Sequence, residues 1–155
     1  MGVYIKGICG VFLLCFSFSL QAADAYIMQK SPYSVEETLN RLEAVLKKKA
    51  ITVFARVDHM AGANKVGLEM RPTQLLIFGN PKMGTPLMNE NQFMGLDLPM
   101  KAMAWEDRDS QVWLAYLNPD ELQRRHNLKN KTIINKMKQA LNGLTNKALN
   151  KDMGN

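Results

Sequence analysis

Two periodic patterns of apolar and polar residues run along this chain, and they predict its secondary structure. Alternation of apolar and polar residues is typical of strands, and apolar residues three and four apart are typical of amphipathic helices. Strands are therefore predicted over 26–30, 51–58, 73–78, 100–106 and 111–117, and helices over 34–49, 119–126 and 133–148. Because the strands are grouped between helices, the pattern predicts an α+β fold with a single, mostly antiparallel sheet packed on helices.

Local signals refine these boundaries. Ser34 followed by Glu37 forms a capping box, in which the Ser34 hydroxyl accepts a hydrogen bond from the backbone N–H three residues on. Asn118 before Pro119 marks a second helix start, because asparagine caps helices and proline suits the first helical position. Alternation in the second strand predicts two faces, one with Ile51, Val53, Ala55 and Val57 and the other with Thr52, Phe54, Arg56 and Asp58. The segment 60–69 is predicted as a loop or a short helix.

The segment 79–99 is predicted to be a long loop. It contains two clusters of glycine and proline, 79–86 and 95–99, which flank a short polar stretch. Its apolar content argues against disorder. We therefore expect an ordered loop that packs back on the sheet as the rim of a pocket, with its apolar side chains buried: Leu87, Met88, Phe93, Leu96 and Leu98.

The first residues have the pattern of a secretory signal. Lys6 supplies a positive charge, an apolar run covers 7–20, and small residues around Ala23 offer a cleavage site. Both cysteines, Cys9 and Cys15, lie in this segment, so a mature chain would need no disulfide. We expect a periplasmic or secreted protein without stable membrane insertion after cleavage. The alternative is an uncleaved membrane anchor, although the apolar run is shorter than the roughly 20 residues of a spanning helix.

The formal net charge of the chain is +6, which raises the question of an anionic partner. The lysines are spread along predicted helices and have no aromatic residues between them that could stack on bases. A solvated helix face explains them better than a nucleic-acid interface, and no nucleic-acid partner is expected.

His59 is the titratable residue with the most chemical potential, because it lies at a strand end beside Asp58. No serine, cysteine or second histidine stands at a recognisable distance from it, so a structural role is favoured over ligand contact, and catalysis is the least favoured. His126 at a helix end is expected to be structural. No residue is therefore assigned as catalytic.

No metal site or cofactor is expected from the sequence. Thioethers suit Cu(I), but the methionines of the long loop and the strand after it are irregularly spaced, which favours a role in the core or in a pocket lining. The segment Gly84-Thr85-Pro86 lacks the lysine of a phosphate-binding loop. The carboxylates Asp97, Glu106 and Asp107 show no spacing that favours acid–base chemistry.

Three segments give the chain a resemblance to a known family: PTQLLIFGNPKMGTPLM from Pro72, GLDLPMKAMAWED from Gly95, and RRHNL from Arg124. With Val57-Asp58-His59 and the small residues after it, they resemble the domain of unknown function 302 family over about residues 30–128. The resemblance implies a compact domain of the TATA-binding-protein-like type, with a curved antiparallel sheet gripping a helix, and often a homodimer. It implies no activity.

The predicted organisation is a signal peptide over 1–23, the family-like domain over 26–128, and a basic amphipathic helix with a tail over 129–155. The function favoured is a non-catalytic binding module for a small molecule or a partner. The residues expected to bind the ligand, polar anchors and pocket lining together, are Asp58, His59, Lys65, Arg71, Phe78, Asn80, Met88 and Trp105. Phe54, Leu76 and Trp113 are also expected in the lining. The alternative is an enzyme on a small anionic or apolar substrate with His59 as acid or base.

The cleavage site can be tested directly. Because small residues follow a short apolar run, the exported protein should begin between Ala23 and Tyr26. N-terminal sequencing of protein recovered from outside the cytoplasm measures this. A sequence beginning at Met1 or Gly2 would contradict it.

Overall fold

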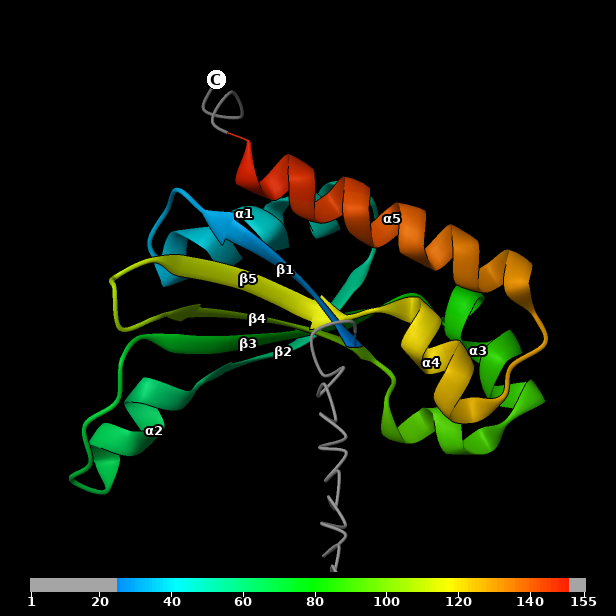
Figure 1. The fold of residues 1–155 in the computed structure, drawn as a ribbon, viewed down its shortest axis with the longest axis horizontal. Helices are drawn as coiled ribbons and strands as arrows, with labels where there is room; N and C mark the ends of the chain where they lie inside the picture. Colours follow the sequence, from blue (N-terminus) through cyan, green and yellow to red (C-terminus); the bar gives the residue numbers. More distant parts are fainter. Residues whose placement is uncertain (1–24, 151–155) are drawn as a thin grey trace, which may run out of the picture.

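A computed structural model describes residues 25–150 of the chain, so the predicted signal peptide over 1–23 and its cleavage site lie outside the described residues. Five strands form one fully antiparallel sheet in the order β1-β5-β4-β3-β2 (Figure 1). The strands are β1 (Tyr26–Ser31), β2 (Thr52–Asp58), β3 (Thr73–Gly79), β4 (Met100–Glu106) and β5 (Val112–Leu117). The helices are α1 (Val35–Lys48), α2 (His59–Lys65), α3 (Pro81–Glu90), η2 (Gln92–Leu96), α4 (Pro119–His126) and α5 (Lys131–Leu149). The α+β prediction is confirmed.

The two longest helices, α1 and α5, cover one face of the sheet (Figure 1). α1 begins as predicted, with the Ser34 side chain accepting a hydrogen bond from the Glu37 backbone N–H at 3.2 Å. Its apolar residues face the sheet and α5, and together they make one core. The fully buried side chains of that core include Leu39, Leu42, Leu46, Leu76, Leu87, Met94, Leu114, Leu122 and Ile134.

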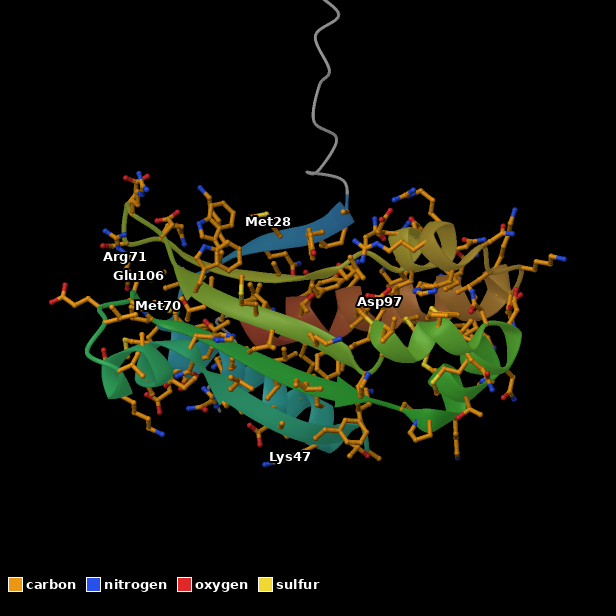
Figure 2. The ribbon with its side chains drawn as sticks, turned by 90° about the horizontal axis from the view of Figure 1, so that it is seen from below. Met28, Lys47, Met70, Arg71, Asp97 and Glu106 are labelled. Atoms are coloured by element: carbon orange, nitrogen blue, oxygen red, sulfur yellow. The ribbon has the colours of Figure 1, made fainter. Side chains whose placement is uncertain are left out.

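The opposite face of the sheet carries no helix over its central strands among the described residues (Figure 2). Its side chains come from the alternate positions of the strands, and many are apolar. Met28, which Figure 2 shows on β1, is 51% exposed, and Phe54 on β2 is 54% exposed. We call this surface the open sheet face. It is lined mainly by Tyr26, Met28, Leu75, Ile77, Met103, Trp105, Trp113 and Leu117.

The two predicted faces of β2 hold only for the first half of the strand. A β-bulge shifts the register between Val53 and Ala55, and an extra residue at a bulge exchanges the faces that follow it. Ala55 is therefore exposed, while Arg56 turns toward α1 and donates hydrogen bonds to Asn40 Oδ1 at 2.6 Å and to Glu36 O at 3.1 Å. The prediction that placed Arg56 opposite the apolar positions was wrong because alternation does not reveal a bulge.

The prediction of a long loop over 79–99 was also wrong, because most of that segment is helical. Asn80 caps α3 by accepting from the Lys82 backbone N–H at 3.0 Å, and Pro81 occupies the start of the helix, where its missing N–H costs nothing. Pro86 lies inside α3 and removes one intrahelical hydrogen bond. Leu87 is fully buried and Phe93 and Leu96 are exposed, so only part of the expected apolar burial occurs.

The basic C-terminal helix, predicted to follow the family-like domain from residue 129, packs as α5 into the same core as the rest of the chain. Its buried residues include Ile134, Met137, Leu141 and Leu144. Arg41 of α1 donates to the backbone oxygens of Ala148 at 2.8 Å and Asn150 at 2.6 Å, which holds the end of α5 to α1.

Leu87 and Leu96 both lie in the segment 79–99 that was predicted to be a loop, but Leu87 is buried and Leu96 is exposed. This difference gives a test of stability. Leu87→Ala should lower the free energy of unfolding by about 2–4 kcal/mol because it opens a cavity under α3. Leu96→Ala, at a residue 77% exposed, should change it by no more than about 0.5 kcal/mol. Urea unfolding followed by circular dichroism measures both. Equal effects of the two substitutions would contradict the packing of α3.

Candidate functional site

An apolar pocket lies where α3, α5 and the ends of three strands meet. The antiparallel register places Gly79 at the end of β3 beside Thr52 at the start of β2, and Phe78 beside Met100 at the start of β4. α3 starts directly after β3, so it closes one side of this corner, and the middle of α5 closes another. The pocket has a volume of about 230 Å³.

The walls of the pocket are formed almost wholly by apolar side chains and glycines. Asn80 and Thr85 are the two polar side chains in the lining, and the Asn80 oxygen already caps α3. Gly84 also lies in the wall, where a Cβ would stand 3.3 Å from Leu98 Cδ1. The larger side chains are contributed by Phe54, Phe78, Met83, Met88, Leu98 and Met137.

Three of the eight residues expected to bind a ligand, Phe78, Asn80 and Met88, line this pocket. Phe54, which was expected in the lining, also contributes to it. Leu76 is fully buried in the core and is not part of the lining. The segment around Met88 therefore forms the rim of a pocket as expected, although it does so as a helix.

The other five expected residues, Asp58, His59, Lys65, Arg71 and Trp105, lie at the opposite ends of the strands. Asp58 pairs with Gln74 near the start of β3, and Trp105 pairs with Thr73. Figure 2 shows Arg71 at the end of the sheet far from Asp97. The antiparallel register separates these residues from the pocket, so the eight do not form one site.

Asp58 has a structural role in this distant group. Its Oδ1 accepts a hydrogen bond from the Ala61 backbone N–H at 2.8 Å and caps α2, while its Oδ2 accepts from Gln74 Nε2 at 3.0 Å. His59 is the exposed first residue of α2. Neither side chain faces the pocket.

The two tryptophans stack at the same end of the open sheet face, with ring centroids 6.4 Å apart. The Trp113 indole N–H donates to Asp107 Oδ2 at 2.7 Å, and this hydrogen bond is the main cause that lowers the pKa of Asp107 below its usual value. Lys30 lies over the Trp113 ring at 5.4 Å from its centroid. The stacked rings and the hydrogen bond to Asp107 join the two arms of the hairpin formed by β4 and β5.

The carboxylates do not gather into an acid–base pair. Asp97 Oδ2 lies within hydrogen-bonding distance of His126 Nε2, at 2.7 Å, and Asp97 Oδ1 lies 3.6 Å from Arg125 Nη1. Glu106 lies at the far end of β4 (Figure 2). Glu121 is held by Arg124 and Arg125, and the hydrogen bond from Arg124 is the largest cause that lowers the pKa of Glu121 to about 2. The contacts of Asp97 therefore join α4 to the end of η2, and those of Glu121 lie within α4.

The contribution of α5 to the pocket was not predicted from the sequence. The pocket is lined by Met137, Ala140, Leu141 and Leu144, which lie more than forty residues after the end of α3. Their spacing on one helical face was visible in the sequence, but nothing local indicated which residues they would meet. The part of the chain that the structure describes contains no group of three or more His, Cys, Asp and Glu residues suited to a metal ion. None of its helices is long and apolar enough to cross a bilayer.

Curated proteins similar to this chain carry the name of an ion channel. The chain is 50% identical over 99 residues to "Fluoride-specific ion channel FluC 1" of Brucella suis biovar 1 (strain 1330), which covers 64% of this chain and 39% of that protein. It is equally similar to "Fluoride-specific ion channel FluC 2" of Brucella melitensis biotype 1, over 37% of that protein. The shared region thus spans well under half of the length of these relatives.

A solved structure and a family profile agree on the fold. The crystal structure of an uncharacterized conserved protein DUF302 from Bacillus stearothermophilus matches with a TM-score of 0.72 at 22% identity, over 79% of this chain and 97% of that one. The sequence profile described as "Domain of unknown function DUF302" matches residues 27–144, which includes most of α5. The chain therefore belongs to the DUF302 family.

Proposed function

We propose that this protein is a non-catalytic binding module that takes up a small apolar molecule in the pocket between α3, α5 and the ends of β2, β3 and β4. The observation that carries the proposal is the pocket itself, with a nearly continuous apolar lining and only Asn80 and Thr85 as polar side chains. Ligand pockets are typically apolar with a few polar groups that orient the ligand. The N-terminal segment supports the further proposal that binding takes place in the periplasm or outside the cell.

The size of the pocket limits the ligand. A dry apolar cavity of about 150 Å³ is large enough to hold benzene. The pocket of about 230 Å³ therefore suits a molecule with one or two rings or a short aliphatic chain. A charged organic group such as a carboxylate or an ammonium would lose its hydration without gaining a charged partner in the lining, which is costly.

The alternative of an enzyme with His59 as acid or base has less support than a binding module. A general base must come within hydrogen-bonding reach of the proton it removes. His59 follows β2 at the end remote from Thr52, whereas the pocket lies at the Thr52 end.

The name of the Brucella relatives describes proteins more than twice as long as the shared region, so that name does not support a proposal of ion transport for this chain.

Filling the pocket from its α5 side tests the proposal. Ala140 and the neighbouring Gln139 are both exposed, but only Ala140 lines the pocket. Ala140→Trp should weaken binding of the fluorescent apolar probe 1-N-phenylnaphthylamine by at least about tenfold, or 1.4 kcal/mol, because the indole occupies the ligand volume. Gln139→Trp is the matched control and should bind as the unaltered chain does. Equal probe affinity in the two variants would contradict the proposal.

The homodimer implied by the family resemblance is also a proposal, and the open sheet face supports it. That face presents apolar side chains from all five strands, and contiguous exposed apolar surface is typical of protein interfaces. An isologous contact between two copies would bury Met28 and the neighbouring side chains of β5 and β4. The pocket between α3 and α5 would stay available, because it lies at a different place on the fold.

A charge placed on the open sheet face tests the dimer. Met28→Glu should convert a dimer into a monomer at micromolar protein concentration, because an unpaired carboxylate would be buried in the contact. Ala44→Glu introduces the same charge at an exposed position of α1 and should leave the dimer intact. Sedimentation velocity measures the mass of each variant. If the unaltered chain is itself a monomer, a second copy of the chain is excluded as the partner of the open sheet face.

A further inference from the structure

Four methionines that are scattered along the sequence meet in the pocket. Met83 and Met88 come from α3, Met100 from the start of β4, and Met137 from α5. Their irregular spacing argued against a metal site when only the sequence was considered. The fold removes that argument, because three separate elements bring these side chains to the walls of one cavity.

Met83 and Met88 are partly exposed in this pocket, whereas Met100 and Met137 are 5% and 6% exposed and lie in its wall. Met88 lies between two glycines of the lining: its Sδ is 3.9 Å from the position of a Cβ on Gly95, and its Cε is 3.9 Å from that of a Cβ on Gly84. Neither glycine has a side chain to cover the sulfur. Methionine also has three rotatable bonds, so its sulfur can adjust to a ligand without movement of the backbone.

We propose that this pocket binds a soft monovalent metal ion, Cu(I), through the thioether sulfurs of Met83, Met88, Met100 and Met137. The inference rests on the same pocket as the proposed function, and it names a second class of ligand for it. Thioethers are soft, neutral ligands that select Cu(I) over harder divalent ions.

The remainder of the lining favours this ion over others. It contains no carboxylate, imidazole or thiol that could hold Zn²⁺ or another divalent ion. A single positive charge also needs less compensation in an apolar surrounding than a double one. The other described methionines do not line the pocket: Met28, Met60, Met70, Met94 and Met103.

Thioether ligation has a pH signature that distinguishes it from other ligand sets. Cysteine and histidine must lose a proton before they bind a metal, so their affinity falls as the pH falls. Thioethers carry no proton in this range. The affinity of the pocket should therefore be the same at pH 5 and pH 8.

The test uses Ag(I), which has the same preference for soft ligands and does not change oxidation state, followed by Cu(I) held against a chromophoric Cu(I) chelator. Every protein is the full chain with Cys9→Ser and Cys15→Ser, so that thiols do not compete. The pocket variant carries Met83→Leu, Met88→Leu and Met137→Leu. The matched control removes as many thioethers outside the pocket, with Met28→Leu, Met70→Leu and Met103→Leu.

The pocket variant should bind Ag(I) and Cu(I) at least about tenfold more weakly than the control, because it loses three of four soft ligands. It should still bind 1-N-phenylnaphthylamine, because leucine conserves the apolar volume of methionine. Loss of metal with retention of the probe supports the metal site and the apolar pocket separately. If the pocket variant also fails to bind the probe, the three substitutions are tested one at a time, in variants whose melting temperature is unchanged. Each of these single variants should bind the metal more weakly than the unaltered chain.

Two results would overturn the inference: equal metal affinity in the pocket variant and the control, or a fall of tenfold or more in affinity from pH 8 to pH 5. If the unaltered chain binds the metal through these methionines but not the apolar probe, the proposed function fails and the metal site stands. If it binds the probe but no metal, the reverse holds.

Discussion

Burial of one sheet face under α1 and α5 is the constraint on which the rest of this structure depends. Leu39, Leu42 and Leu46 of α1 lie fully buried against Leu76 and Leu114 of the strands. Burial of apolar area at roughly 25 cal/mol per Å² makes such a layer the main favourable term in a domain of this size. Polar side chains that are buried at the edge of this layer form hydrogen bonds with each other, as the hydroxyls of Ser31 and Thr38 do at 2.6 Å.

This layer also explains why the pocket and the charged groups are separated. Once β2 and β3 pair in antiparallel register, the residues at Asp58 and those at Gly79 must lie at opposite ends of the sheet. The bulge in β2 then turns Arg56 toward α1, where it binds Asn40 and the carbonyl oxygen of Glu36. The charges near β2 thus stabilise the helix layer, and the apolar corner at the other end is left without them.

The two surfaces without a partner in this structure have different shapes and would suit different ligands. The pocket beside α3 is a small cavity with methionine, phenylalanine and leucine walls, which fits a small molecule or a soft ion. The open sheet face is broad and carries Met28, Trp105 and Trp113, which fits a protein surface. Apart from Phe54 the two surfaces are lined by different residues, so one can be altered without removing the other.

The five strands and the helices α1, α4 and α5 could be predicted from the sequence, because they depend on short-range patterns. The Ser34 cap, the Asn118–Pro119 helix start and the alternation of β4 and β5 are all local, and the structure has each of them. Phe78 and Asn80 flank the end of β3, which the sequence also located, and both line the pocket. The helical state of 81–90 was missed because Pro86 normally ends a helix, whereas here burial of Leu87 outweighs the lost hydrogen bond.

Only the tertiary structure decided which residues share a site. The bulge between Val53 and Ala55 has no local signal, and it determines whether Arg56 faces solvent or α1. Met137 meets Met83 and Met88 because α5 packs against α1. These two helices are more than fifty residues apart in the sequence. Periodicity identifies the face that a helix buries, but the identity of the residues it buries against is a property of the whole packed chain.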